Sequence, residues 1–276
     1  MNILTSPLAD PVDMDRRFGG IGRLYGAQAL ARFTTAHVCV IGVGGVGSWI
    51  VEALARSGIG ELTLIDLDNV AESNINRQLQ ALTSTIGQAK IDALAERITQ
   101  INPYCKVNRV EEFVTPDDLD QLLTGKYDFV IDAIDSVRDK AALIAWCHAR
   151  GLPVITIGSA GGKTDPTRIE VRDLTRTEQE PLLKMVRKRL RSQYGFPRSI
   201  KTKFHIDAVF SMEPVSMPET SAEEGDSCAV DAITGLNCAG FGSCMVVTAT
   251  FGMFAAGHVL RQLAGAAVQT SAAALS

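Results

Sequence analysis

The feature that most constrains the fold is a glycine-rich turn between an apolar segment and a helix-forming segment. Residues 37–43 (HVCVIGV) are typical of a buried strand, GVGGVG follows at 42–47, and a helix is expected over 47–57, ending at Gly58. In such a junction Gly42 permits the tight turn, Gly44 and Gly45 let the backbone approach a phosphate, and Gly47 lets the helix pack closely. The start of a helix also favours negative charge. The pattern predicts a nucleotide-binding unit; a tight turn without a ligand is the alternative.

Strands and helices continue to alternate along the chain as far as residue 158. We expect strands at 61–66, 105–113, 127–135 and 153–158, and helices at 87–101, 117–123 and 137–150, the last capped by Ser136. This alternation predicts right-handed crossovers and an α/β, Rossmann-like fold, with a mainly parallel sheet covered by helices on both faces.

The alternation of single strands and helices ends after residue 160. Two antiparallel strands are expected at 167–173 and 204–213, separated by a basic helical stretch, PLLKMVRKRLRSQYG. A loop at 214–237 then leads into an apolar helical segment at 238–263, and the Ala-rich end, 265–275, is expected to fray. We predict one domain over 1–276: a nucleotide-binding part (1–160), an extension (161–264) and a tail (265–276).

Charge is distributed unevenly along the chain. The formal net charge of the 276 residues is −4, yet residues 172–203 hold ten Lys and Arg against three acids. A basic segment in an acidic protein indicates a polyanionic partner. The residues expected to contact it are Lys184, Arg187, Lys188, Arg189 and Arg191. A solvated basic helix without a partner is the alternative.

Residues 232–260 contain no Asp, Glu, Lys or Arg. Their length is that of a membrane-spanning helix, but the glycines at 235, 240, 242, 252 and 257 favour a helix packed closely in a core or a dimer. We expect a cytoplasmic protein without a secretory signal, with membrane association through 238–260 as the alternative.

The six cysteines form no CxxC pair. A four-cysteine zinc site is therefore not expected, and reduced thiols in a cytosolic protein fit the sequence best.

The polar residues after the second and fourth expected strands point to chemistry on phosphates. Asp66 is placed to bind ribose hydroxyls, which an NAD-dependent oxidoreductase would also need. Arg77 and Asn74 follow near the same edge of the sheet, and a guanidinium there offsets the charge that develops during transfer at phosphorus. Lys90 begins a helix where an anion would be favoured, which indicates a phosphate ligand. In DAIDS, Asp132 or Asp135 is expected to hold Mg²⁺.

Taken together, GxGGxG, D-x-D-x-V-x-x-S-N-x-x-R-Q, G-x-x-K and D-x-x-D resemble the adenylation domain of the ubiquitin-activating-enzyme-like superfamily over about residues 17–160. The resemblance implies that ATP and Mg²⁺ adenylate a carboxylate and release pyrophosphate. It assigns Gly42–Gly47 and Asp66 to adenosine, Asn74, Arg77 and Lys90 to the phosphates, and Asp135 to magnesium. Asp68 and Gln78 also match the pattern.

Within that superfamily, four further segments resemble the tRNA threonylcarbamoyladenosine dehydratase branch: RFGGIGRLYG, IGSAGGKTDPTRI, the basic helix and NCAGFGSCMVVTATFG. The resemblance implies adenylation and cyclisation of the threonyl carboxylate on tRNA, a homodimer, and a motif cysteine at Cys238 as a further catalytic candidate. A monovalent cation and a sulfur-transfer partner protein stay open. Activation of a carrier protein that ends in glycine is the alternative enzyme, and a non-catalytic nucleotide-binding scaffold is a third reading.

Overall fold

The computed structural model describes residues 12–216 and 241–273. Its helices are α1 (Met14–Tyr25), α2 (Ala27–Thr35), α3 (Gly47–Arg56), α4 (Lys90–Ile101), α5 (Leu119–Leu122), α6 (Val137–Ala149), α7 (Pro181–Gln193) and α9 (Met245–Ala273). Its strands are β1 (His37–Ile41), β2 (Glu61–Ile65), β3 (Lys106–Val110), β4 (Phe129–Asp132), β5 (Val154–Ile157), β6 (Ile169–Asp173) and β7 (Asp207–Ser211).

The strands form a single seven-stranded sheet in the order β3-β2-β1-β4-β5-β7-β6. The first five strands are mutually parallel, β7 lies parallel to β5, and β6 alone runs antiparallel, against β7. The predicted α/β fold and its antiparallel extension are confirmed. The strand order reverses beside β1, so the carboxyl ends of β1 and β4 frame the crevice where ligands of such sheets bind.

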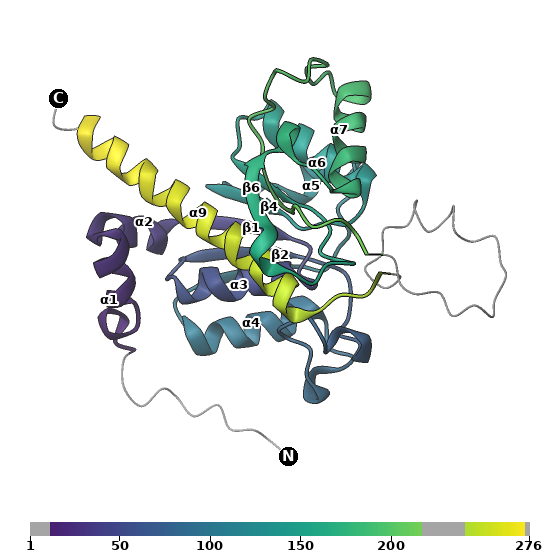
Figure 1. The fold of residues 1–276 in the computed structure, drawn as a ribbon. Coiled ribbons are helices and arrows are strands. Elements are labelled where there is room, and N and C mark those ends of the chain that lie inside the picture. Colours follow the sequence, from purple (N-terminus) through teal and green to yellow (C-terminus); the bar gives the residue numbers. More distant parts are fainter. Residues whose placement is uncertain (1–11, 217–240, 274–276) are drawn as a thin grey trace.

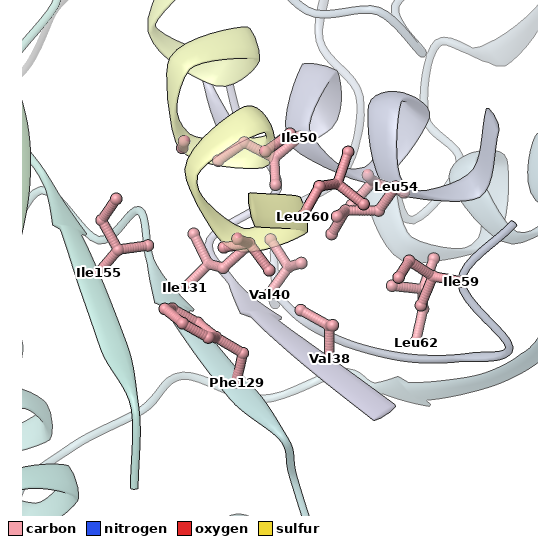
Figure 2. Packing of buried hydrophobic residues seen from close by; sticks show 14 of the residues in the cluster. Val38, Val40, Ile50, Leu54, Ile59, Leu62, Phe129, Ile131, Ile155 and Leu260 are labelled. Atoms are coloured by element: carbon pink, nitrogen blue, oxygen red, sulfur yellow. The ribbon is translucent and has the colours of Figure 1, made fainter. Parts of the chain in front are cut away.

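Helices cover both faces of the sheet. Figure 1 shows α9 running along one face beside α3, with α6 and α7 together on the other side. On the α9 face, Ile50 and Leu54 of α3 and Leu260 of α9 pack against Val40 and Ile131 of the central strands (Figure 2). Each fully buried aliphatic side chain of this kind contributes roughly 1.5–3 kcal/mol to folding, so this face fixes where α9 lies.

The C-terminal apolar segment is a helix of the core. Val247, Phe251 and Ala255 of α9 are fully buried, and a Cβ on Gly252 would lie 2.9 Å from Trp49 Cβ. The glycine therefore allows α9 to approach α3 closely. The helix continues to Ala273, so the tail that was expected to fray is helical over most of its length. Within residues 12–216 and 241–273, no helix has both the length and the apolarity needed to cross a membrane.

Two helices near the N-terminus, α1 and α2, were not among the expected elements. They add apolar side chains to the α9 face, and Phe33 of α2 is fully buried. Residues 217–240, which include most of the expected loop, Cys228 and Cys238, lie outside the described residues.

Candidate functional site

A pocket of about 610 Å³ opens at the carboxyl ends of β1, β2, β4 and β5. Its lining includes almost every residue that the sequence assigned to nucleotide chemistry: Gly44, Gly45, Gly42, Asp66, Asp68, Asn74, Arg77, Gln78, Lys90 and Asp135. A volume of this size is ordinary for a small-molecule or cofactor site. The fold thus brings residues from four separate segments of the chain together around one pocket.

The glycine-rich turn depends on two very close backbone approaches. Gly42 has a φ of +83°, and a Cβ there would lie 2.8 Å from the Ala133 carbonyl oxygen of the segment after β4. A Cβ on Gly47 would lie 1.9 Å from the carbonyl oxygen of Gly42. Gly47 was expected to serve helix packing; the structure shows that it is needed for the turn itself, because that carbonyl occupies the place of a side chain.

The Asp66 carboxylate is fixed by the backbone at the end of β2. Oδ2 accepts a hydrogen bond from Val43 N at 2.8 Å, and Oδ1 accepts one from Asp68 N at 2.9 Å. Burial raises the pKa of Asp66, although Lys90 and the two backbone donors act in the opposite direction. These contacts aim the carboxylate into the pocket from the strand end where ribose hydroxyls are bound in dinucleotide-binding folds.

Lys90 is a buried lysine at the first position of α4. Its Nζ lies 2.6 Å from Asp68 Oδ2 and 4.0 Å from Asp66 Oδ1, and only 5% of the residue is exposed. Two carboxylates therefore balance a cation that the helix N-terminus would disfavour. A solvated surface lysine, the ordinary alternative, is excluded by this burial.

The segment between β2 and α4 carries the other polar residues of the pocket. Asn74 is buried, and its Oδ1 accepts a hydrogen bond from Ala71 N at 3.0 Å. The Arg77 guanidinium donates from Nη1 to the carbonyl oxygen of Ser73 at 2.6 Å. This leaves most of its five N–H donors available for an anion.

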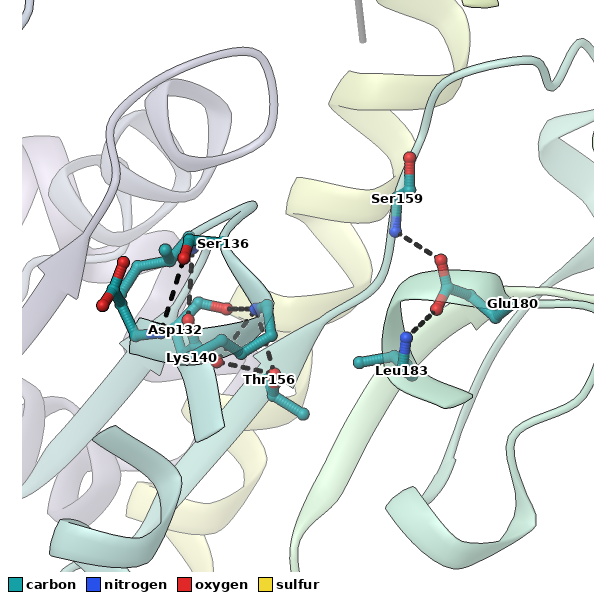
Figure 3. Close-up of polar contacts among 9 residues, drawn as sticks. Asp132, Ser136, Lys140, Thr156, Ser159, Glu180 and Leu183 are labelled. Carbon is teal, nitrogen blue, oxygen red and sulfur yellow. Dashed lines mark hydrogen bonds and ion pairs between the residues drawn. The ribbon is translucent and has the colours of Figure 1, made fainter. Parts of the chain in front are cut away.

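The two aspartates of DAIDS have different surroundings. Asp132 is fully buried, and its Oδ2 accepts hydrogen bonds from Lys140 Nζ at 2.9 Å and Thr156 Oγ1 at 2.7 Å (Figure 3). It is therefore a structural anchor beneath the pocket. Asp135, three residues later, is exposed and lines the pocket. Of the two carboxylates that the sequence offered for Mg²⁺, the geometry leaves Asp135.

Sequence reasoning missed Glu180, which joins the basic helix to the pocket wall. This buried side chain caps α7 by accepting a hydrogen bond from Leu183 N, and its other oxygen accepts one from Ser159 N at 2.8 Å (Figure 3). Burial raises the pKa of Glu180, although the two N–H groups and nearby lysines lower it. Ser159 and Leu182 both line the pocket. The sequence signal was a glutamate directly before Pro181, where helices take their cap.

The five basic residues expected on α7 do not share one environment. Lys184 and Lys188 are exposed, one turn apart. Arg187 is turned inward to the Leu174 carbonyl and the Thr177 hydroxyl, and burial lowers its pKa. Arg191 donates to the Pro197 carbonyl, and the Nε of Arg189 is buried without a hydrogen-bond partner in the described structure. Lys184 and Lys188 are thus the members of the set most available to an external anion.

The catalytic candidate Cys238 lies outside the described residues. The four cysteines inside them, Cys39, Cys105, Cys147 and Cys244, are free thiols. Burial raises the pKa of Cys147 to about 12, and it raises that of Cys39 further. Because the thiolate is the reactive form, neither of these two is suited to be a nucleophile.

Comparison with known proteins gives one family match, which covers most of the chain. The model of the ThiF family matches residues 20–275. A Haemophilus influenzae protein named tRNA threonylcarbamoyladenosine dehydratase is 53% identical over 250 residues, which cover 90% of this chain and 94% of the relative. The Escherichia coli protein of the same name is 50% identical over 253 residues, covering 90% and 93%.

Among solved structures, the chain is similar to a crystal structure of E. coli tRNA N6-threonylcarbamoyladenosine dehydratase in complex with ATP. The TM-score is 0.83 and the identity 48%, and the match covers 92% of this chain and 96% of the other. The likeness thus extends over most of both chains.

Proposed function

Because the chain belongs to the ThiF family, we infer that it is an ATP-dependent tRNA threonylcarbamoyladenosine dehydratase. The observation that carries this conclusion is the convergence of Asp66, Arg77 and Lys90 in one pocket, on a fold shared almost end to end with a dehydratase that binds ATP. A scaffold that only binds nucleotide needs neither a buried lysine nor a half-buried arginine at the phosphate end. Hydride transfer does not need them either.

Within the pocket, each residue has a proposed role. Asp66 accepts hydrogen bonds from the ribose hydroxyls, and the turn from Gly42 to Gly47 faces the phosphates at the start of α3. Asn74, Arg77 and Lys90 bind the phosphates, with Gln78 and Asp68 behind them; the 2.6 Å contact between Asp68 and Lys90 holds the ammonium at the pocket wall.

Asp135 is proposed as the residue that would hold Mg²⁺ in the ATP pocket. Among the described residues, no three His, Cys, Asp or Glu side chains form a metal cluster. One exposed carboxylate nonetheless fits Mg²⁺, which is commonly held by one or two carboxylates, substrate phosphates and water. When bound, the ion neutralises charge on the phosphates during transfer.

The chemistry follows from what Arg77 and Lys90 do at the α-phosphate. The threonyl carboxylate of the modified adenosine attacks the α-phosphorus, the bond to the β-phosphate breaks, and pyrophosphate leaves. Positive charge from the two side chains offsets the negative charge that develops on the phosphoryl oxygens. The carbamoyl group then attacks the acyl carbon and loses a proton, AMP leaves with a former carboxylate oxygen, and a five-membered ring closes. The nucleoside has lost one water.

Substrate binding is proposed to use the basic helix α7. Its exposed Lys184 and Lys188 contact tRNA phosphates, and the Glu180 cap connects this helix to the pocket wall. We place the reaction in the cytoplasm, because tRNA is the substrate.

A homodimer is proposed, with α9 contributing to the interface. Val246, Met253 and Phe254 are apolar and exposed on this helix. A monovalent cation site, acyl or sulfur transfer by Cys238, and a sulfur-transfer partner protein remain further proposals; the first step described above requires none of them.

The decisive experiment is mass spectrometry of nucleosides from tRNA carrying threonylcarbamoyladenosine, incubated with the protein and Mg·ATP. We expect loss of one water from the modified nucleoside with the wild type and no loss with Lys90→Ala. Lys126→Ala is the matched control, because this exposed lysine precedes the amino end of β4, whereas the pocket opens at the carboxyl ends of the strands. If the wild-type protein binds ATP but the nucleoside mass does not change, the dehydratase assignment is wrong. Pyrophosphate release with a carrier protein ending in glycine would then support the alternative.

A further inference from the structure

The carbonyl oxygen of Arg77 receives hydrogen bonds from two side chains that are distant in sequence. Trp49 of α3 donates from Nε1 at 3.0 Å, and Thr248 of α9 donates from Oγ1 at 3.3 Å. We propose that Trp49 and Thr248 are positioning residues for Arg77, so that the C-terminal helix is a working part of the ATP site. This inference rests on the proposed role of Arg77 at the phosphates.

The first turn of α9 also holds the residue before Arg77. Met245 N donates to the Asn76 carbonyl oxygen at 3.1 Å, and Asn76 Nδ2 donates to the Ser243 carbonyl oxygen at 2.8 Å. These bonds run in both directions between two segments almost 170 residues apart, so the loop and the start of α9 are joined as one unit.

The contacts of the Arg77 side chain do not fix it relative to the sheet. Nη1 donates to the carbonyl oxygen of Ser73 and to Oδ1 of Asn76, and both partners belong to the same loop. A guanidinium held only in this way would move whenever the loop moves. Fixed anchors outside the loop are therefore needed to keep Arg77 in place for transfer at phosphorus, where small displacements are costly.

The two donors are themselves anchored in the core. Thr248 is 2% exposed, lines the pocket, and lies between the fully buried Val247 and Phe251. Trp49 packs against Gly252 of α9, where any side chain would collide with it. Ser48 adds an anchor further along the loop by accepting a hydrogen bond from Leu79 N at 3.2 Å. Packing of α9 on α3 thereby determines where Arg77 lies.

The test distinguishes the effect of the Thr248 hydrogen-bond donor from that of the side-chain volume. Thr248→Val keeps the volume and removes the donor; Trp49→Phe removes the indole N–H. For each variant we expect kcat for dehydration to fall about three- to tenfold, with the KM for ATP changed less than about twofold, because one hydrogen bond is lost and Arg77 acts mainly on the transition state. Thr248→Ser restores most of the lost kcat. Thr99→Val, which removes an exposed hydroxyl on α4, is the matched control.

A structural role alone would not make the effect depend on Arg77. In an Arg77→Lys background, we expect Thr248→Val to lower kcat by less than about twofold, because the group that Thr248 positions has already been replaced. If Thr248→Val lowers kcat by the same factor in the Arg77→Lys background as in the wild type, the inference is wrong. It is also wrong if kcat is unchanged in both Thr248→Val and Trp49→Phe. Thermal unfolding shows whether either variant has merely lost stability. If one has, the kcat of the other variant tests the inference.

The outcome also distinguishes this inference from the proposed function. If Arg77→Ala, which removes the positive charge, leaves turnover unchanged, Arg77 has no role at the phosphates, and the inference falls with that assignment. If Arg77→Lys abolishes most turnover while neither positioning variant changes kcat, the proposed function stands and only the inference fails.

Discussion

The least expected residue beneath the ATP pocket is Lys140, a lysine with no exposed surface. Its Nζ donates to Asp132 Oδ2 at 2.9 Å, to Thr156 Oγ1 at 3.1 Å and to the Asp132 carbonyl oxygen at 3.2 Å (Figure 3). Burial raises the pKa of Asp132, and Lys140 is the strongest influence lowering it. The ion pair therefore ties α6 to the end of β4, directly before the exposed Asp135.

Removing one member of this pair should cost more than removing both. We expect Lys140→Met to lower the free energy of unfolding by about 3–5 kcal/mol, because Asp132 would be left as an uncompensated buried charge. The double variant Asp132→Asn with Lys140→Met should recover part of this loss. Urea denaturation of the three proteins measures both effects. A Lys140→Met protein as stable as the wild type would show that the pair does not anchor the pocket floor.

Asp135 should instead affect magnesium use without affecting stability. Because its carboxylate is exposed and faces the pocket, we expect Asp135→Asn to raise the Mg²⁺ concentration needed for half-maximal turnover by about tenfold, with the melting temperature almost unchanged. Titration of Mg²⁺ at saturating ATP tests this, with the exposed Asp117→Asn as control. An unchanged Mg²⁺ requirement would remove Asp135 from the proposed metal site.

Residues that belong to a local sequence pattern could be predicted from the sequence, whereas residues whose role depends on a tertiary contact could not. Asp66 and Lys90 follow a strand end and open a helix, so their place at one edge of the sheet could be inferred from the chain alone. The roles of Lys140 and Glu180 depend on their tertiary partners. Lys140 pairs with Asp132 of β4, and Glu180 accepts a hydrogen bond from Ser159, 21 residues earlier in the chain. No rule of spacing predicts such tertiary pairs, and the charge of Lys140 argued for exposure.

At the scale of elements, α7 shows why the expected basic set was too broad. The helix is amphipathic, and Leu183, Val186 and Leu190 are fully buried on its inner face. A run of basic residues on such a helix necessarily places some of them beside that face, where their aliphatic stems pack and their donors find backbone carbonyls. Arg187 and Arg191 do this, whereas Lys184 and Lys188 face outward.

The two outward-facing lysines of α7 should therefore contribute to the salt dependence of tRNA binding. We expect Lys184→Ala and Lys188→Ala each to weaken tRNA binding and to reduce the slope of log affinity against log salt by about 0.7–1, the value for one lost phosphate contact. Lys106→Ala, on the strand at the far edge of the sheet, is the control. Binding measured between low and moderate salt tests this. A slope unchanged in both lysine variants would show that tRNA contacts another surface.

Helix boundaries were predicted best where caps mark them. Ser136 caps α6 as expected, by accepting a hydrogen bond from Asp139 N. Neither α1 nor α2 was expected, although α1 begins with an aspartate cap at Asp13. The long α9 extends to Ala273, beyond the expected end of the apolar segment at residue 263, because the Ala-rich stretch has a strong intrinsic helix preference.

At the scale of the whole molecule, α9 connects parts of the chain that the sequence treats separately. It packs on α2 and α3 of the nucleotide-binding half, approaches β6 of the extension, and holds the Arg77 loop. The sequence of residues 232–260, an apolar stretch without Asp, Glu, Lys or Arg, was consistent with a membrane, core or dimer helix. Its buried face is now explained by the core, but Val246, Met253 and Phe254 remain exposed along the other side.

This outward side of α9 gives the homodimer proposal a direct test. One continuous stripe on α9 is formed by residues at helical spacing, at positions 246, 250, 253, 254 and 257. In a symmetric dimer, the stripe of one subunit would pack against the same stripe of the other. We expect a dimer by light scattering at micromolar concentration and a monomer for Phe254→Glu, because burying an unpaired charge at an interface is unfavourable. Met185→Glu, an exposed apolar residue on α7, should stay dimeric. A monomeric wild type would contradict the dimer, and a dimeric Phe254→Glu protein would place its interface elsewhere.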